Sequence, residues 1–373
     1  MKFIVSSSLL LKQLQQIGGV ISTNTVLPIL EDFLFEINQK KLSIIATDLE
    51  TVMHVQADVE SSENGKICIP AKILLESLKN LPDQPLTFTI ESNFSIEITS
   101  DNGKYKIMGE DPSNFPKAPS ADDATGFEMS GSALLTAINK TLFAVSGDDL
   151  RPAMTGVFFE LSKDFVQFIS TDAHRLVRYK RTDVQNSAEA SFIVPKKPLT
   201  ILKNTLPNND DKLSLSYNGS HLFVTYGGTS SMICRLIDAR FPDYKVVIPA
   251  NNPYTLTVAK IDFQNALRRV SVFANKSTNQ VALTISGSEL EMAAQDVDFS
   301  FEGNERMHCQ YNGEDLQIAF NARLLVELIG AIDTNDINIE LSTPNKAGLV
   351  KPTEQKENEE LMLLVMPLML NSN

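Results

Sequence analysis

Six segments of the chain carry apolar residues at helical spacing, and they follow one another about every sixty residues. The segments alternate between two types. In the first type, two apolar positions four residues apart match across three copies, as expected for one face of a helix. The matched sets are Leu10, Leu134 and Phe263, and then Leu14, Ile138 and Leu267.

The second type of segment has a basic residue at a matched position. Lys72, Lys197 and Arg323 share that position, and Leu74, Leu199 and Leu325 share an apolar one. The alternation of the two types predicts three copies of a domain with two helices. The expected helical windows are 8–21, 70–81, 131–145, 195–206, 260–276 and 320–332.

Between the helical windows, short runs alternate apolar and polar residues and are rich in β-branched and aromatic side chains, which predicts antiparallel strands. We therefore expect each domain to contain two units, each with one helix followed by a short set of antiparallel strands. The expected strands are 29–37, 41–49, 51–59, 85–91, 94–100, 104–110, 155–162, 165–172, 175–182, 212–218, 221–227, 231–238, 280–286, 288–296, 299–311, 336–342 and 361–370.

Clusters of Pro, Asn and Ser mark residues 112–126 and 248–254 as linkers. We therefore expect three domains, which suits a chain of 373 residues. Their expected bounds are 1–124, 125–252 and 253–373. The charged segment 351–360 is expected to form a surface loop within the third domain.

The composition, 43% hydrophobic and 21% charged, is typical of a folded soluble protein. The apolar start is too short for a signal peptide, and the terminal apolar run is shorter than the roughly 20 residues of a membrane span and contains Pro367. Cys68, Cys234 and Cys309 lie far apart without CxxC spacing, which favours neither disulfides nor zinc. We expect a cytoplasmic protein without a cofactor or metal.

Positive charge is concentrated in the helical windows, although the formal net charge of the chain is −13. The windows carry twelve Lys or Arg residues against only Glu76, Asp262 and Glu327, so they total +9 and the rest of the chain −22. Helix propensity does not explain this, because Glu is as good a helix former as Lys. A basic set of helices on an acidic body predicts one face built for a polyanion.

Six units of one helix with its strands, two in each domain, favour a curved array with sheets outside and helices inside. Such an array leaves unpaired strand edges at its two ends, and a head-to-tail dimer pairs both of them. The expected fold is therefore α+β, with three similar domains that each place two helices on antiparallel sheets. Two chains are expected to close into a ring.

Two other classes of function remain open at this point. Asp172, His174 and Arg175 lie in a TDAHR segment that is suggestive of catalysis, but no motif completes a site, and His54, His221 and His308 lie in separate repeats without ligand spacing. A non-enzymatic role is favoured. The second class is a scaffold that contacts proteins only and does not hold DNA.

Along its whole length the sequence resembles the bacterial β sliding clamps, the processivity subunits of DNA polymerase III. The resemblance implies a homodimeric ring of six similar domains around duplex DNA, with twelve helices lining the hole. It also implies as partners the replicative polymerase, the clamp loader, and other polymerases and repair factors that carry short linear motifs, but no membrane. The matching stretches are LPIL (27–30), TDLE (47–50), NFP (114–116), STDAHRL (170–176), DARFPDY (238–244), FNARLLVELIGAI (320–332) and VMPLML (365–370).

The family slides on DNA because the ring lining contacts phosphates without reading bases. This chain has Asn24 where the family offers an Arg, and Pro152 and Ala153 where the family sometimes has aromatic residues, so more of the DNA contact is expected from the helices. The expected DNA-facing residues are Lys12, Lys72, Lys79, Lys140, Arg151, Lys196, Lys197, Lys203, Arg268, Arg269, Lys276 and Arg323.

The family's second site is an apolar pocket between the second and third domains that receives partner peptides. Leu, Val, Met and Pro walls suit varied apolar anchors. The family usually has a basic residue at Met369, and Asn371, Ser372 and Asn373 extend the tail. The resemblance places in this pocket Thr171, His174, Arg175, Leu176, Pro242, Val247, Leu364, Met366, Pro367 and Leu368.

The resemblance also implies a ring joint between an edge of the first domain and an edge of the third. Tyr105 and Ile107 align with the apolar side of one edge, and Val272 and Phe273 with the other. We expect Lys104 and Lys106 to face Asp298 and Glu302, because opposite charges beside an apolar centre fix the register.

Overall fold

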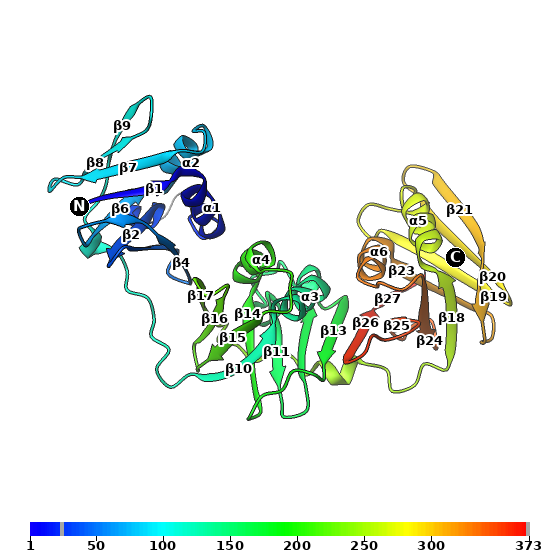
Figure 1. The fold of residues 1–373 in the computed structure, drawn as a ribbon. Helices are drawn as coiled ribbons and strands as arrows, with labels where there is room; N and C mark the ends of the chain where they lie inside the picture. Colours follow the sequence, from blue (N-terminus) through cyan, green and yellow to red (C-terminus); the bar gives the residue numbers. More distant parts are fainter. Residues whose placement is uncertain (23–25, 371–373) are drawn as a thin grey trace. The chain divides into compact units, whose positions relative to one another are not determined.

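The computed structural model describes residues 1–22 and 26–370, and Figure 1 labels their helices and strands. The chain divides into two compact units. The first unit is Met1–Leu135 with Lys197–Leu236, and the second is Thr136–Lys196 with Ile237–Asn373. Each unit is described by itself below. Asn24 lies outside the described residues.

The six predicted helices are all present. Their N-terminal ends lie within three residues of the prediction, but most helices end earlier than expected, so that Lys276 lies in a turn beyond its helix. The bounds are α1 Ser7–Ile17, α2 Ala71–Lys79, α3 Gly131–Thr141, α4 Lys196–Thr205, α5 Lys260–Ser271 and α6 Ala322–Gly330.

The first unit contains two antiparallel sheets. The five-stranded sheet has the order β5 (Glu60–Ser61), β1 (Lys2–Ser6), β7 (Pro85–Ile90), β8 (Ser95–Thr99), β9 (Lys104–Met108). The eight-stranded sheet has the order β10 (Thr125–Ser130), β15 (Lys212–Tyr217), β16 (His221–Tyr226), β17 (Ser230–Arg235), β4 (Thr51–Asp58), β3 (Lys41–Thr47), β2 (Asp32–Asn38), β6 (Gly65–Pro70).

The second unit repeats this arrangement. Its nine-stranded sheet has the order β14 (Ala190–Pro195), β11 (Gly156–Leu161), β12 (Val166–Thr171), β13 (Arg175–Arg181), β26 (Glu359–Val365), β25 (Gly348–Pro352), β24 (Asp336–Leu341), β18 (Tyr254–Ala259), β22 (Gln310–Tyr311). Its five-stranded sheet has the order β21 (Phe301–His308), β20 (Glu289–Asp296), β19 (Gln280–Ser286), β23 (Leu316–Asn321), β27 (Pro367–Leu368).

Each helix is preceded directly by a strand, and this strand is exchanged between the two halves of its domain. In the first domain, β1 leads into α1 but pairs with β7 of the second half, whereas β6 leads into α2 but pairs with β2 of the first half. The second and third domains repeat the exchange through β10 with β15, β14 with β11, β18 with β24, and β23 with β19. The exchange ties the two halves of each domain together.

The sequence prediction missed these leading strands. Their apolar residues run into the helix without Gly, Asn or another turn signal between, so the pattern of residues 69–70 or 194–195 looks like the start of the helix. β25 was also missed. Most of the strands that follow the helices are confirmed within two or three residues, except that residues 29–31 form a 3₁₀ helix, η1 (Pro28–Glu31), before β2. The run 299–311 is divided between β21 and β22, which lie in different sheets, and the run 361–370 between β26 and β27.

The cores are made by the residues that the repeat identified. The three copies of each apolar position, Leu10, Leu134 and Phe263, and then Leu14, Ile138 and Leu267, are all buried. The matched Leu74, Leu199 and Leu325 of the other helix type are also buried. Each buried Leu or Phe contributes about 1.5–3 kcal/mol relative to exposure.

Candidate DNA-facing helices and partner pocket

Most of the predicted DNA-facing cations extend into solvent from helices or from the turns next to them. Lys12, Lys72, Lys79 and Lys203 are exposed helical residues with no ion pair among the described residues. Lys196, Arg268 and Lys276 are exposed too, and Arg268 contacts Asn265 on its own helix. These side chains have the reach that sequence-independent phosphate contacts need.

Lys140 does not fit the prediction of an exposed DNA contact, because it is only 8% exposed. Its ammonium group donates to the backbone oxygen of Ala331 and lies 2.9 Å from the carboxylate of Asp333. The Ala331 carbonyl belongs to the C-terminal end of α6, where a cation is favourable. Burial by itself would raise the pKa of Asp333, but the bonds from Lys140 and Lys356 lower it. Lys140 therefore fixes α3 to the end of α6.

Four further predicted cations are exposed but already paired. Lys197 donates to the backbone oxygen of Val20 at 3.1 Å and to Asp48 at 2.5 Å. Arg269 makes two bonds of 2.7 Å with Glu305, and Arg323 lies 3.6 Å from Glu327 on its own helix. Arg151, which precedes the 3₁₀ helix η4 (Pro152–Met154), binds Asp148 at 2.8 Å. A polyanion has to compete with a carboxylate at each of these positions.

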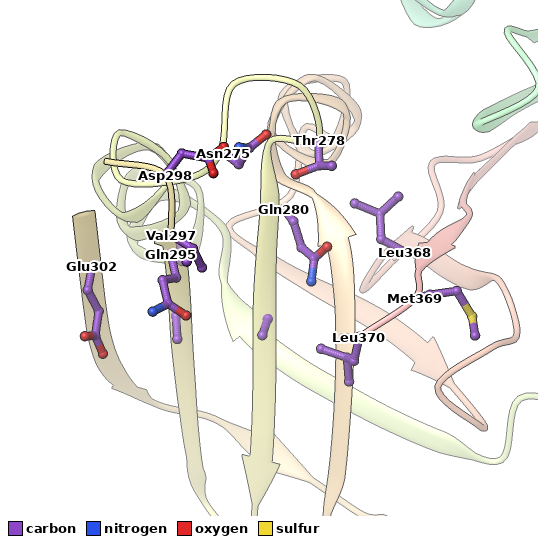
Figure 2. Close-up of a pocket in the computed structure, with 13 residues that line it drawn as sticks. Asn275, Thr278, Gln280, Gln295, Val297, Asp298, Glu302, Leu368, Met369 and Leu370 are labelled. Atoms are coloured by element: carbon purple, nitrogen blue, oxygen red, sulfur yellow. The ribbon is translucent and has the colours of Figure 1, made fainter. Parts of the chain in front are cut away.

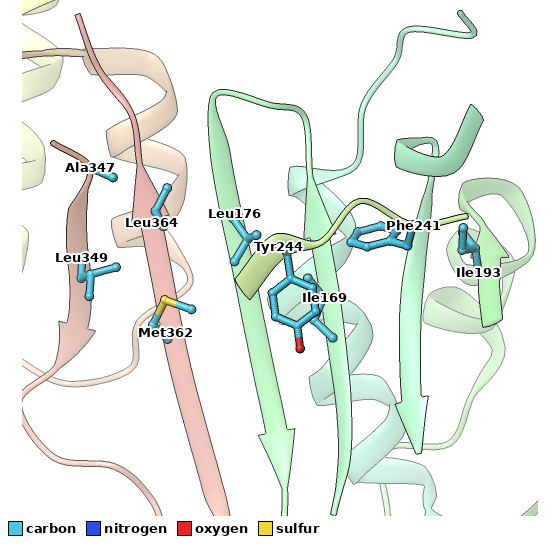
Figure 3. Packing of buried hydrophobic residues seen from close by; sticks show 9 residues of the cluster. All are labelled: Ile169, Leu176, Ile193, Phe241, Tyr244, Ala347, Leu349, Met362 and Leu364. Carbon is cyan, nitrogen blue, oxygen red and sulfur yellow. The ribbon is translucent and has the colours of Figure 1, made fainter. Parts of the chain in front are cut away.

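An apolar cluster in the second unit forms on one face of the nine-stranded sheet, where β13 of the second domain pairs with β26 of the third. Leu176 lies opposite Leu364, and Leu364 lies opposite Leu349 on the next strand. Figure 3 shows these side chains together with a chain segment that crosses the same face. The cluster consists of Ile169, Leu176, Ile193, Phe241, Tyr244, Ala347, Leu349, Met362 and Leu364.

The crossing segment is the linker between the second and third domains, which includes the 3₁₀ helix η5 (Tyr244–Val247). Phe241 stacks on Phe158 with ring centroids 4.6 Å apart. The Tyr244 hydroxyl donates to Glu160 at 2.7 Å and accepts a bond from Gln167 at 2.9 Å. Burial would raise the pKa of Glu160, but the bonds from Tyr244, Gln167 and Lys245 lower it. Burial and the Glu160 carboxylate both raise the pKa of Tyr244.

Of the ten residues predicted for the partner pocket, only Leu176 and Leu364 belong to the cluster itself. Val247 and Met366 are 46% and 39% exposed, so they offer apolar surface beside it. Pro242, Pro367 and Leu368 are partly buried, and His174 is exposed. The backbone N–H of Met366 donates to the His174 oxygen at 2.9 Å, which attaches the terminal segment to the turn before β13.

Thr171 and Arg175 are buried and build the turn, so they are not walls that a ligand contacts directly. The Thr171 hydroxyl donates to the Arg175 oxygen at 2.6 Å. The Arg175 guanidinium binds Asp172 at 3.0 Å, Glu327 at 2.7 Å and the Phe143 oxygen at 2.8 Å. The Arg175 guanidinium is therefore paired within the fold, where its hydrogen bonds connect β12, β13, α6 and the end of α3.

Sequence reasoning missed seven members of the cluster. Met362 lies two residues before Leu364 on β26, so strand alternation from Leu364 would have indicated it. Ile169 and Ile193 lie on β12 and β14, which reach this face only through strand pairing. Phe241 and Tyr244 lie within the quoted DARFPDY stretch. The remaining two, Ala347 and Leu349, lie at and before the start of β25, which the sequence pattern did not reveal.

The two strands predicted to form the ring joint are free sheet edges in this chain. β9 is one edge of its sheet and exposes Lys104, Tyr105 and Lys106; β21 is one edge of the other five-stranded sheet and exposes Glu302. Val272 and Phe273, at the end of α5, are exposed large apolar residues. Lys104 is paired within its own sheet with Glu97, at 2.9 Å.

The described residues offer no group of three or more His, Cys, Asp or Glu side chains able to hold a metal ion. His174 is exposed and Asp172 is bound to Arg175. Over residues 1–22 and 26–370, no helix is long and apolar enough to cross a membrane.

Three family models match the chain in sequence order. The N-terminal domain of the DNA polymerase III beta subunit matches residues 1–119, the central domain matches 128–243, and the C-terminal domain matches 245–368. Among curated relatives, the beta sliding clamp of Haemophilus influenzae is 28% identical over 99% of this chain and 100% of the relative. That of Pseudomonas aeruginosa is 26% identical, with the same coverage.

Solved structures give the same result. The sliding clamp of Pseudomonas aeruginosa bound to griselimycin superposes with a TM-score of 0.94 at 26% identity, and 99% of this chain and 100% of that chain are covered. The DNA polymerase III beta subunit of Thermotoga maritima has a TM-score of 0.90 at 26% identity, with 99% of each chain covered.

Proposed function

Because the chain belongs to the DNA polymerase III beta subunit family, the family of bacterial beta sliding clamps, we propose that two copies close into a ring around duplex DNA and hold the replicative polymerase on its template. The family resemblance and the three similar clamp domains predicted from the sequence are confirmed. The family is one of processivity subunits, so the non-enzymatic role is confirmed as well.

The observation that carries the closed dimer is a rule of strand pairing that repeats inside the chain. The last strand of one domain's first half pairs with the last strand of the next domain's second half: β4 pairs with β17, and β13 with β26. Among the described strands, two of this kind lack such a partner, β9 at one end and β21 at the other. A second copy supplies both missing partners, because its β9 complements β21 and its β21 complements β9.

The internal junctions also give the register of this joint. Met53 pairs with Met232, and Val177 with Leu363. Strand pairing within the domains shows that Gly303 on β21 is equivalent to Met53 on β4 and Val177 on β13. In the same way, Tyr105 on β9 is equivalent to Met232 on β17 and Leu363 on β26. Tyr105 therefore lies opposite Gly303 of the second copy.

This register places Lys106 opposite Glu302 and Ile107 opposite Phe301. It does not pair Lys104 with Asp298, because Lys104 lies opposite Asn304 and Asp298 lies in the turn before β21. A Cβ on Gly303 would lie 2.6 Å from the Phe273 ring, so glycine lets Phe273 lie flat against the strand where Tyr105 arrives. The joint then has an apolar centre of Tyr105, Ile107, Phe273 and Phe301 and a flanking ion pair. Such pairing fixes register more than it adds affinity.

For the DNA-facing surface, we propose Lys12, Lys72, Lys79, Lys203, Arg268 and Lys276 as the main phosphate contacts, with the exposed Lys196 as a further one. Arg151, Lys197, Arg269 and Arg323 contribute less, because each has a carboxylate partner. The basic helices on an acidic body support this assignment. Because these contacts release counterions, binding should weaken steeply with salt.

For partner proteins, we propose that apolar side chains of short linear motifs bind against Leu176, Leu364, Val247 and Met366. The replicative polymerase, the clamp loader, other polymerases and repair factors are the expected partners. The domain bounds 1–124, 125–252 and 253–373 remain our proposal, and the protein is expected to act in the cytoplasm, where bacterial DNA is replicated.

Sedimentation of charge-reversal variants tests the closed dimer. Lys106→Glu and Glu302→Lys should each weaken the dimer roughly tenfold through like-charge repulsion across the joint, and the two changes in one chain should restore it. Lys41→Glu, at an exposed position of the inner strand β3 away from β9 and β21, is the control, because its partner Asp58 lies within the same sheet. A monomeric wild type at micromolar concentration, or a double variant no tighter than the single ones, would contradict the proposal.

A further inference from the structure

Strand pairing identifies equivalent positions on the face of each domain's first half that points away from its helices. In the first domain, Leu34 pairs with Cys68 on one side and Ile45 on the other. In the second domain, Phe158 pairs with Ile193 and Ile169. In the third domain, the same three positions are Ala282, Ala319 and Ala293. At these positions the third domain therefore has three alanines, where the first two domains have larger residues.

The first two domains cover these positions with a phenylalanine from their own outgoing linker. Phe115 is buried in a cluster with Leu34, Cys68 and Ile29, and Ile45 packs against it. Phe241 stacks on Phe158 in the second domain. In both linkers the phenylalanine precedes a proline, in Asn114-Phe115-Pro116 and Arg240-Phe241-Pro242. The same surface thus receives the same kind of side chain twice within this chain.

The linkers also approach in the same way. Glu110 exchanges backbone hydrogen bonds with Cys68, and the Ile237 N–H donates to the Ile193 oxygen at 3.0 Å. In the third domain, Leu368 of β27 takes this place by pairing with Ala319. The terminal segment therefore begins to cross the face as the linkers do.

Over the alanine positions of the third domain there is an open groove of about 700 Å³. Figure 2 shows Gln280 and Gln295 on neighbouring strands, with Leu368 and Leu370 on the terminal segment beside them. None of the residues that line the groove is aromatic. The groove has a small apolar floor, aliphatic side chains along one wall, and the amide groups of Gln280 and Gln295, which are able to bind a peptide backbone. Asp298 and Glu302 line its other end, and the second of them belongs to the proposed ring joint.

We propose that this groove binds an aromatic side chain, followed by proline, from an extended segment of a partner protein. The occupant has the chemistry of Arg240-Phe241-Pro242, because this chain itself uses such a segment on the equivalent face of its second domain. The three alanines make room that Leu34 or Phe158 fills elsewhere. The site lies on a different sheet from the cluster of Leu176 and Leu364.

Methyl NMR with ¹³C-labelled alanine in the full chain tests the proposal directly. The probe is a synthetic peptide with the sequence of residues 237–245, Ile-Asp-Ala-Arg-Phe-Pro-Asp-Tyr-Lys, and the control peptide has alanine in place of its phenylalanine. An aromatic ring over the floor shifts the methyl signals of Ala282 and Ala293 by its ring current. We expect this shift at millimolar peptide, and at least tenfold weaker binding of the control.

A groove-filling variant provides the second measurement. Ala282→Leu introduces the side chain that the first domain carries at this position, so the fold should accept it, and peptide affinity should fall at least tenfold. Ser286→Leu, on the same face of β19 but outside the groove, should leave the affinity unchanged. The inference is overturned if the Ala282 and Ala293 signals do not move, or if only alanine methyl signals near Leu176 move. It is also overturned if the two variants bind the peptide with the same affinity.

Discussion

The two internal strand junctions have the same scaffold but different surfaces. The turn at 47–51 before β4 and the turn at 171–175 before β13 both begin with Thr-Asp, and Leu49 and Ala173 adopt left-handed conformations with φ of 76° and 75°. In each turn the threonine hydroxyl and the aspartate carboxylate accept the same backbone hydrogen bonds. Arg235 N–H binds the Glu50 oxygen just as Met366 N–H binds the His174 oxygen.

The side chains on this common scaffold differ in kind. At the second junction, Met366 and Val247 present apolar surface and Tyr244 closes one side. At the first junction, Arg235 occupies the position of Met366 and lies 3.4 Å from Glu50. Ala121 corresponds to Val247, because each lies six residues after the phenylalanine of the Phe-Pro pair in its linker. The backbone repeat therefore sets where a pocket can form, and a few side chains decide whether apolar partners bind there.

The largest expected difference concerns the last residue of the turn at each junction, Arg175 and its counterpart Thr51. Arg175→Ala should lower the free energy of unfolding of the second unit by about 3–5 kcal/mol, because Asp172 and Glu327 lose a buried charged partner. Thr51→Ala should cost about 1 kcal/mol or less. Urea unfolding monitored within each unit measures both, and equal losses would contradict a structural role of Arg175.

Asp32 distinguishes the first domain from the second, which has Gly156 at the matched position. Asp32 is 3% exposed, and its Oδ2 has no hydrogen-bond partner. Burial raises its pKa to about 7 from 3.8, with Glu110 and Glu31 adding to the shift. The folded chain therefore holds the proton more tightly than the unfolded chain, and stability falls as the pH rises from about 4 to 7.

Asp32→Asn should remove this dependence. At pH 8 the variant should be more stable than the wild type by about 2–4 kcal/mol, and the difference should vanish near pH 4. Thermal unfolding at a series of pH values measures the effect. A pH-independent difference between the two proteins would contradict a raised pKa of Asp32 in the folded chain.

Exchange of one side chain at each junction tests which of them binds apolar partners. Met366→Glu should weaken binding of a motif-bearing partner peptide about tenfold or more, because a charge replaces exposed apolar surface in the pocket. Arg235→Glu, at the matched position, should leave this affinity unchanged. Fluorescence anisotropy with a labelled peptide from the polymerase measures both constants, and an equal loss in the two variants would refute the assignment.

The smallest expected effect is that of the Glu50 and Arg235 pair, since both side chains are 62% exposed. A double-mutant cycle with Glu50→Ala and Arg235→Ala should give a coupling of about 0.5 kcal/mol or less, and less still at high salt. A coupling above about 1.5 kcal/mol would mean that this pair holds the first junction closed.

The repeat made much of the fold predictable, because helical and strand periodicity identify buried faces such as that of Leu10 and Leu14 without knowledge of the tertiary structure. The leading strands were not predictable in this way. β6 and β14 run straight into their helices and pair with a strand from the other half of the domain, so only long-range pairing defines them.

The site was predicted less completely than the fold. Exposure of Lys12 or Lys203 follows from the polar face of a helix, but Lys140 lies on the same type of face and is buried by the end of α6, which no local pattern reveals. Leu176 and Leu364 were identified by resemblance, whereas Leu349 joins them through a missed strand. Ion-pair partners such as Glu327 of Arg175 come from distant segments and cannot be inferred from spacing.

Retention on circular DNA is the most direct test of the central claim that this chain forms a closed ring around the duplex. The protein is loaded by its clamp loader onto a nicked circle and passed through a gel-filtration column, and the circle is then cut at one site. Our account predicts that the protein comigrates with the intact circle in moderate salt and is lost after linearisation. Equal loss from the circle and the linear DNA, or retention on linear DNA with free ends, would contradict it.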